Sequence, residues 1–269
     1  MKREGRVYLV FQISAAAWLF GWFLKYKFFG PYFSNLIFTY PVFTDQFPPF
    51  FQNPNVAFTA YHMPVLCILG IFTQKRFVYI GMSLLMLICT IILGLHIDTY
   101  NDMTFISSFW VALWLLWYSF HIDDQRHIKA HAPLIAKCII ALLFLGGTVG
   151  KLTPEYWSGE AFYNLVVHQT PGYAGIYLRN TFTIENQKLI LGVLSKMIIM
   201  AEGLMILSPL YPYRIFCVFG VCVIFMLVLF REWQIFSVLS CLAGITLSCL
   251  LLIDGTKSKH KLAKNAQRY

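Results

Sequence analysis

Residues 133–160 read PLIAKCIIALLFLGGTVGKLTPEYWSGE. The first eighteen of these residues hold only two polar side chains, and as an α-helix they would be about 27 Å long. Because the hydrocarbon core of a bilayer is about 30 Å thick, this stretch predicts a membrane-spanning helix. Lys151 follows it directly, and Trp157 and Gly159 lie in the turn beyond, where the chain leaves the lipid.

The rest of the chain has the same apolar character. Of its 269 residues, 58% are hydrophobic and 12% are charged, which is about half the charged share of a soluble domain. Eight stretches are long and apolar enough to span a membrane, roughly 7–24, 56–73, 77–95, 104–120, 133–150, 188–207, 214–230 and 234–253. We therefore predict an all-α polytopic membrane bundle of about eight transmembrane helices. One transmembrane domain covers 1–255, and 256–269 form a basic cytoplasmic tail.

The basic residues are unevenly distributed between the predicted loops. With the N-terminus inside, thirteen Lys and Arg residues fall in cytoplasmic segments and six in outer segments. By the positive-inside rule, this asymmetry predicts that both termini are cytoplasmic. The net charge of +9 is therefore a topology signal, and the basic tail is expected to contact membrane lipids and not nucleic acid. The seven cysteines lie in apolar stretches without a C-x-x-C pair, which predicts no disulfide framework and no metal site.

Three predicted outer segments, residues 26–55, 97–103 and 151–187, share the face on which Lys151 emerges. The first is rich in proline and aromatic residues, so it cannot be one continuous helix and is expected to lie at the membrane interface. These segments predict a pocket at the outer rim of the bundle.

The run from Gly146 to Glu160, with its lysine, tryptophan and final glycine, resembles the core signature of the vitamin K-dependent γ-carboxylase family and its bacterial relatives, the HTTM membrane proteins. The resemblance implies that Lys151 is the base that begins the chemistry, on a vitamin K-like hydroquinone and without a metal. It also implies a bacterial inner-membrane location. The carboxylases carry a large lumenal domain after their membrane region. This chain has about sixteen residues after its last predicted span, so we expect a short form.

Lys151 has two interpretations from the residues themselves. It can be a snorkelling lysine, whose stem covers lipid while its ammonium group reaches water at a helix C-terminus. As a base it would need a neutral amine, which burial against Trp157 would favour by lowering its pKa. The glycines before Lys151 would let a flat ligand approach the backbone, and Gly159 is expected to adopt a positive φ. With Trp157, it would shape the turn that holds the amine.

A second resemblance is looser. The carboxylases have Trp-Asn-Asn-His-Ser-Tyr between their third and fourth spans, where this chain has Tyr-Asn-Asp-Met-Thr-Phe at 100–105. The match implies substrate-binding roles for Asn101 and Thr104. Met103 stands where the family has the histidine that helps couple quinone oxidation to carboxylation. Asp102 is either a replacement polar partner or a solvated loop carboxylate.

Several ionisable residues lie inside predicted spans, and three of them, Lys196, Glu202 and His62, are candidates for a role. Lys196 and Glu202 are six residues apart in one span and well off a common face, so they are not expected to pair with each other. Glu202 is either a structural hydrogen-bond centre or a proton-handling group. His62 either makes a helix–helix hydrogen bond or binds a quinone carbonyl. His121, His127 and His131 are interpreted as part of a solvated cytoplasmic loop.

Two functional hypotheses follow. The first is an HTTM-type membrane enzyme, a hydroquinone-dependent lyase or oxidoreductase that resembles γ-carboxylase and acts on a quinone or lipid substrate at the outer membrane face. The alternative is a non-catalytic membrane subunit, which uses the same groove to hold a lipid or the helix of a membrane or periplasmic partner protein.

Overall fold

The computed structural model describes residues 3–26, 49–95, 103–169, 173–230, 237–238 and 240–253, and the regular structure within them is helical. The chain divides into two compact units. The first unit comprises Met1–Ala136 and Ser237–Tyr269, and the second unit comprises Lys137–Phe236. The boundary falls within one helix, α7 (Gln125–Val149). Each unit is described by itself.

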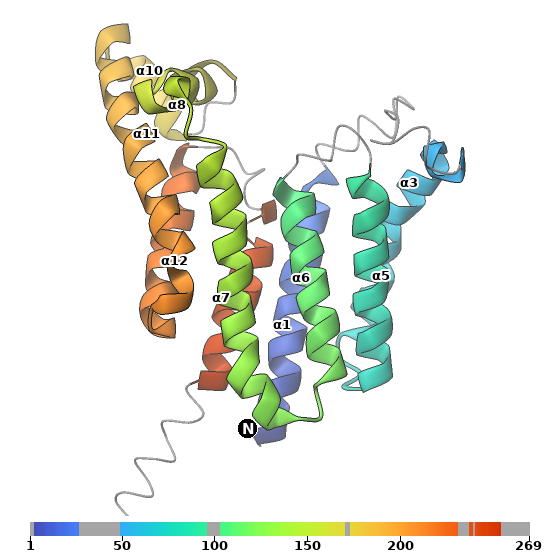
Figure 1. Ribbon diagram of the computed structural model, residues 1–269. Helices are drawn as coiled ribbons and strands as arrows, with labels where there is room; N and C mark the ends of the chain where they lie inside the picture. Colours follow the sequence, from blue (N-terminus) through green and yellow to red (C-terminus); the bar gives the residue numbers. More distant parts are fainter. Residues whose placement is uncertain are drawn as a thin grey trace, which may run out of the picture. The chain divides into compact units, whose positions relative to one another are not determined.

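The first unit is built on three long apolar helices, α1 (Arg3–Leu24), α5 (Arg76–Gly94) and α6 (Met103–Phe120), with α6 packed against both others (Figure 1). Large aromatic side chains fill its core, and their polar atoms reach backbone carbonyls. Trp18 donates its indole N–H to the Ser108 carbonyl at 2.8 Å, and Tyr118 donates its hydroxyl to the Val7 carbonyl at 2.9 Å. In lipid such bonds are needed, because a buried polar group has no water to bind.

The predicted span 56–73 is not one helix. It consists of α3 (Pro54–His62), a 3₁₀ turn η2 (Met63–Leu66) and a single turn α4 (Cys67–Gly70). Pro64 lies in the 3₁₀ turn, and proline lacks the backbone N–H that would continue the α-helical hydrogen bonds. An open apolar groove of about 660 Å³ lies between α1 and this broken segment, with Gln12 as its polar lining residue.

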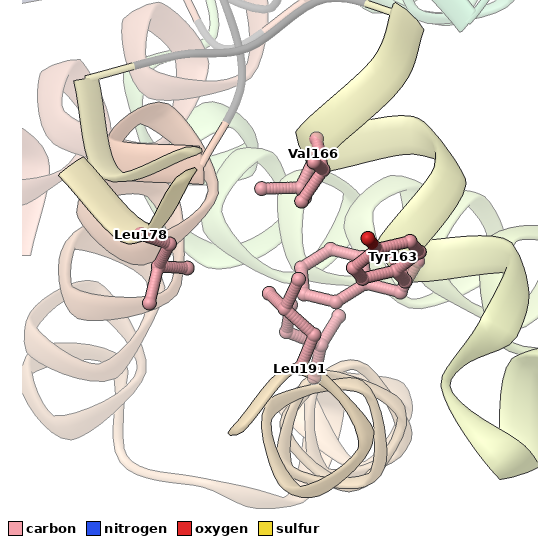
Figure 2. Packing of buried hydrophobic residues seen from close by; sticks show 7 residues of the cluster. Tyr163, Val166, Leu178 and Leu191 are labelled. Atoms are coloured by element: carbon pink, nitrogen blue, oxygen red, sulfur yellow. The ribbon is translucent and has the colours of Figure 1, made fainter. Parts of the chain in front are cut away.

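The second unit contains the C-terminal part of α7, two short helices α8 (Pro154–Ser158) and α9 (Glu160–Tyr163), and a π-helical turn η3 (Asn164–Gln169). It continues with α10 (Tyr173–Thr181), α11 (Ile184–Ile206), a 3₁₀ turn η4 (Ser208–Leu210) and α12 (Tyr213–Phe230). α11 packs against α8 and α9. Figure 2 shows the core that joins these elements, with Tyr163 from α9 beside Leu191 from α11, and with Val166 and Leu178 nearby.

Within the described residues, five helices are long and apolar enough to cross a membrane, namely Gly5–Leu24 of α1 together with α5, α6, α7 and α11. Two shorter apolar segments are the Tyr213–Cys222 part of α12 and the helix Ser240–Ile253. The all-helical fold is confirmed and fits an integral membrane protein, but the predicted count of about eight spans is not confirmed. Both termini, the basic tail at 256–269 and the loop residues Asn101 and Asp102 lie outside the described residues.

Candidate functional site

The second unit contains an ion pair between Lys151 and Glu202. The ammonium Nζ lies 2.7 Å from Glu202 Oε2 and 2.9 Å from Oε1, and it also donates to the Gly147 carbonyl at 3.3 Å. The Glu202 side chain is 5% exposed and that of Lys151 is 26% exposed. The carboxylate is therefore buried, while the Lys151 side chain is partly exposed. Sequence analysis singled out both residues but did not predict that they pair.

The end of α7 explains how Lys151 reaches this position. The helix ends at Val149, and the Lys151 backbone N–H bonds to the Thr148 carbonyl at 3.0 Å. Helical side chains point toward the N-terminus, so the stem of Lys151 folds back along the last turn to the Gly147 carbonyl. A Cβ on Gly147 would lie 3.5 Å from Glu202 Oε2 and 3.6 Å from Lys151 Nζ. The glycine therefore leaves the flank of the pair uncovered by a side chain.

Glu202 belongs to α11 and contacts Lys151 from that helix. A carboxylate inside an apolar helix is costly unless it is paired and hydrogen-bonded, and Lys151 supplies both requirements. Removing one partner of such a buried pair costs about 3–5 kcal/mol, because the other charge is left uncompensated. The arrangement can bind an anion through the ammonium and accept a proton at the carboxylate. It can also pass a proton between the two groups.

The turn after Lys151 docks on the same face of α11 that carries Glu202. Gly159 has φ +88°, the positive φ expected from the sequence, and it ends α8. A Cβ at this position would overlap the Gly192 backbone of α11. Ser195, one turn further along α11, donates its hydroxyl to the Tyr156 carbonyl at 2.6 Å. Since Ser195 and Glu202 are seven residues apart, they share one face of the helix.

Trp157 lies in the same turn, but its side chain is 52% exposed. The hydrogen bonds of Lys151 go to α7 and α11 and not to α8. An indole at this position suits the headgroup layer, where the ring is apolar and the N–H reaches water. A role for Trp157 as a wall beside the amine stays a prediction.

Thr148 adds an unpaired hydroxyl to the site. The residue is 8% exposed, and among the described residues its Oγ1 is a buried polar atom with no hydrogen-bond partner. Thr148 is in the last turn of α7, three residues before Lys151 in the chain. Buried hydroxyls are normally satisfied by protein or water. The Thr148 hydroxyl is therefore a buried polar atom that the described residues leave unsatisfied.

A second lysine of α7 has a structural role that sequence analysis missed. Lys137 donates to the Pro209 carbonyl at 2.9 Å and to the Tyr211 carbonyl at 2.7 Å, and Ser208 donates its hydroxyl to the Lys137 carbonyl at 3.0 Å. These bonds satisfy backbone carbonyls in the turn between α11 and α12. α7 thus holds α11 at Glu202 and also holds the turn that follows α11.

The remaining predicted site residues are described within their own units. In the first unit, Thr104 is buried and its hydroxyl lies 2.8 Å from that of Ser237. His62 donates from Nδ1 to the Phe58 carbonyl of its own helix at 2.8 Å. Lys196 lies on the exposed side of α11. Met103 begins α6 and is 40% exposed.

The three histidines near the start of α7 form a stack. The rings of His121 and His127 are 4.7 Å apart, and those of His127 and His131 are 4.2 Å apart. Asp124 accepts the backbone N–H groups of His127 and Arg126, chiefly that of His127, and these bonds lower the pKa of its carboxyl. Within the described residues, no group of three or more His, Cys, Asp or Glu side chains is placed to hold a metal ion.

These features define a helical protein that fits an integral membrane protein, with a buried lysine–glutamate pair at the end of one of its long apolar helices. Comparison of the chain with protein-family models, with curated proteins and with solved structures finds no match.

Proposed function

We propose that the chain is a small membrane enzyme of the HTTM or γ-carboxylase-like type, which deprotonates a hydroquinone or similar lipid-soluble acid. Lys151 is the base, and Glu202 is the group that receives the proton of the resting Lys151 ammonium before the base acts. The observation that carries the proposal is the distance of 2.7 Å between Lys151 Nζ and the buried Glu202 Oε2.

The resting pair is an ammonium facing a carboxylate, and an ammonium is not a base. When an apolar substrate excludes water from the open side, the charged form loses solvation, and the neutral amine and carboxylic acid become more accessible. One proton then moves from Lys151 Nζ to the Glu202 carboxylate. The free amine takes the hydroxyl proton of the hydroquinone, which leaves a hydroquinone anion beside a restored ammonium. Loss of the Glu202 proton to water returns the pair to its starting state.

The surroundings of the pair suit a flat substrate. Gly147 presents no side chain on the flank of the ion pair, so a ring can approach the backbone closely. The Thr148 hydroxyl can bond to a substrate oxygen, which would satisfy its unpaired atom. In this proposal Trp157 and Gly159 position the turn, whereas the substrate-binding roles of Thr104, Asn101, Asp102 and His62 stay predictions from the sequence.

The proposed setting is a bacterial inner membrane with both termini in the cytoplasm, which puts Lys151 at the outer face. The support is the distribution of thirteen basic residues against six. Single cysteines introduced at Thr99, Glu160 and Leu262 test this topology in intact cells. An impermeant thiol reagent should label positions 99 and 160 and not position 262. Labelling of position 262 from outside would contradict the proposed orientation.

The enzymatic proposal is tested with vitamin K hydroquinone, dissolved O2 as the electron acceptor and the purified protein in lipid vesicles. Lys151→Arg keeps the positive charge but cannot deprotonate near neutral pH, so quinol oxidation should fall by about 10²-fold or more. Lys188→Arg, an exposed lysine near the start of α11, is the matched control and should retain turnover. Full turnover in Lys151→Arg would refute the base. No turnover in the wild type, with lipid or protein held at the site, would favour the non-catalytic subunit.

A further inference from the structure

Two charged residues in the second half of α11, Lys196 and Glu202, differ in exposure and in pairing. Glu202 is buried and paired with Lys151. Lys196 lies on the exposed side of the helix, and in the part of the chain that the structure describes it has neither an ion pair nor a hydrogen bond. It is twelve residues from the start of α11 and ten from its end, so it is near the middle of a candidate membrane span.

Lys196 sits within a row of exposed apolar side chains. We call this row the α11 stripe. Its members are between 44% and 70% exposed, and they are Leu189, Val193, Met197, Met200, Leu204 and Leu207. From Val193 onward their spacing alternates between four and three residues. That alternation is the pattern by which one helix packs along another in a coiled coil.

Neither water nor lipid suits this surface. Water would face a contiguous row of large apolar side chains, which soluble surfaces rarely expose. Lipid would face an unpaired lysine, which is costly at the depth of a span and defaults to a paired or functional role. The nearer end of the α11 stripe is Leu189, seven residues or about 10 Å along the helix axis from Lys196. The Lys196 ammonium is therefore far from that end.

A second copy of the chain also does not fit. In a symmetric contact through the α11 stripe, Lys196 would face Lys196. The nearest carboxylate on the exposed side of α11 is Glu185, which is eleven residues away, or about 16 Å along the axis.

We propose that the α11 stripe binds a transmembrane helix of another protein, which carries an Asp or Glu opposite Lys196. The apolar side chains pack between the two helices, and the carboxylate pairs with the ammonium at the same depth. This inference does not rest on the proposed enzymatic function, because it uses the face of α11 opposite to Glu202.

The test uses a defined probe, a synthetic Leu/Ala-rich transmembrane helix with one central Asp. The probe and the purified chain carry a donor–acceptor pair of dyes and are mixed in phosphatidylcholine vesicles. Energy transfer should show association about tenfold tighter than for the same helix with Asn. Lys196→Met should lose this difference, whereas Lys196→Arg should keep it because arginine also pairs with a carboxylate.

Lys188→Met is the matched control, since it removes a lysine from the first turns of α11 and should leave association unchanged. Thermal melting of each variant in detergent shows whether the fold survives. Equal binding of the Asp and Asn helices would overturn the proposal. Self-association of two differently labelled pools that depends on Lys196 would also overturn it, since a second copy would then cover the stripe. If Lys151→Arg abolishes quinol oxidation but helix binding persists, the two proposals are separated.

Discussion

The two units satisfy the polar groups within their apolar helices in different ways. In the first unit, the candidate spans α1, α5 and α6 carry no charged side chain beyond their first turn, and neutral donors such as Trp18 and Tyr118 bond to backbone carbonyls. In the second unit, the same task falls to Lys137, Lys151 and Glu202. The neutral bonds of the first unit show that apolar helices can pack without buried charges. The charges kept in the second unit therefore support our proposal that Lys151 and Glu202 form the site.

The largest expected effect comes from breaking the pair in the second unit. Glu202→Leu leaves Lys151 without its carboxylate and should lower the free energy of unfolding by about 3–5 kcal/mol. The double variant Lys151→Met/Glu202→Leu should recover much of this loss, because two apolar side chains can replace a buried ion pair. Denaturant titration in detergent micelles measures both. Additive losses in the double variant would show that the two residues do not interact.

The turn beside the pair should be the next most sensitive position. Gly159→Ala forces a side chain into positive φ and against the Gly192 backbone, and should cost at least about 1–3 kcal/mol. Gly203→Ala, at a helical position with open space around it, is the matched control and should be neutral or slightly stabilising. Thermal melting compares the two. Equal melting temperatures would mean that the turn does not constrain α11.

A neutral bond in the first unit should matter for stability alone. Trp18→Phe removes the indole N–H that bonds to the Ser108 carbonyl and should cost about 1–2 kcal/mol. Quinol turnover per folded molecule should be unchanged, because the site lies in the second unit. Activity normalised to the folded fraction is the measurement, and a specific loss of turnover would contradict the division of roles between the units.

The smallest effect concerns Asp124 at the start of α7. Its lowered pKa means that the ionised carboxylate stabilises the fold above the ordinary Asp value of 3.8, and that this contribution is lost as the pH falls below it. Asp124→Asn keeps a capping side chain without the charge. The stability difference between wild type and variant should therefore be constant near neutral pH and vanish in acid. A stability difference between wild type and variant that grows in acid would contradict the lowered pKa of Asp124.

The sequence predicted those parts that depend on local pattern. α1, α5, α6, α7 and α11 follow from apolar runs of about twenty residues. Gly159 was expected in positive φ because it lies in the turn after Lys151, and glycine adopts positive φ at little cost. The predicted span 56–73 is not one continuous helix, because hydropathy carries no information on the missing backbone N–H of Pro64.

The site depends on contacts that local pattern does not encode. Lys151 and Glu202 are fifty-one residues apart, and their pairing requires the end of α7 to lie against the last turns of α11. The signal in the sequence was the presence of opposite charges in or beside two apolar spans, since such charges need partners in lipid. Nothing in the local pattern distinguished Lys151 from other basic residues as the partner of Glu202. The bonds of Lys137 to the turn after α11 were hidden for the same reason.

The central claim is that the proton of Lys151 moves to Glu202 when substrate binds. Infrared difference spectroscopy of the protein in lipid vesicles, recorded with and without vitamin K hydroquinone, follows this proton directly. A band from a protonated carboxylic acid should appear on hydroquinone binding in the wild type and be absent in Glu202→Gln. A carboxylate that stays ionised when hydroquinone is bound, or a band that persists in Glu202→Gln, would contradict the account.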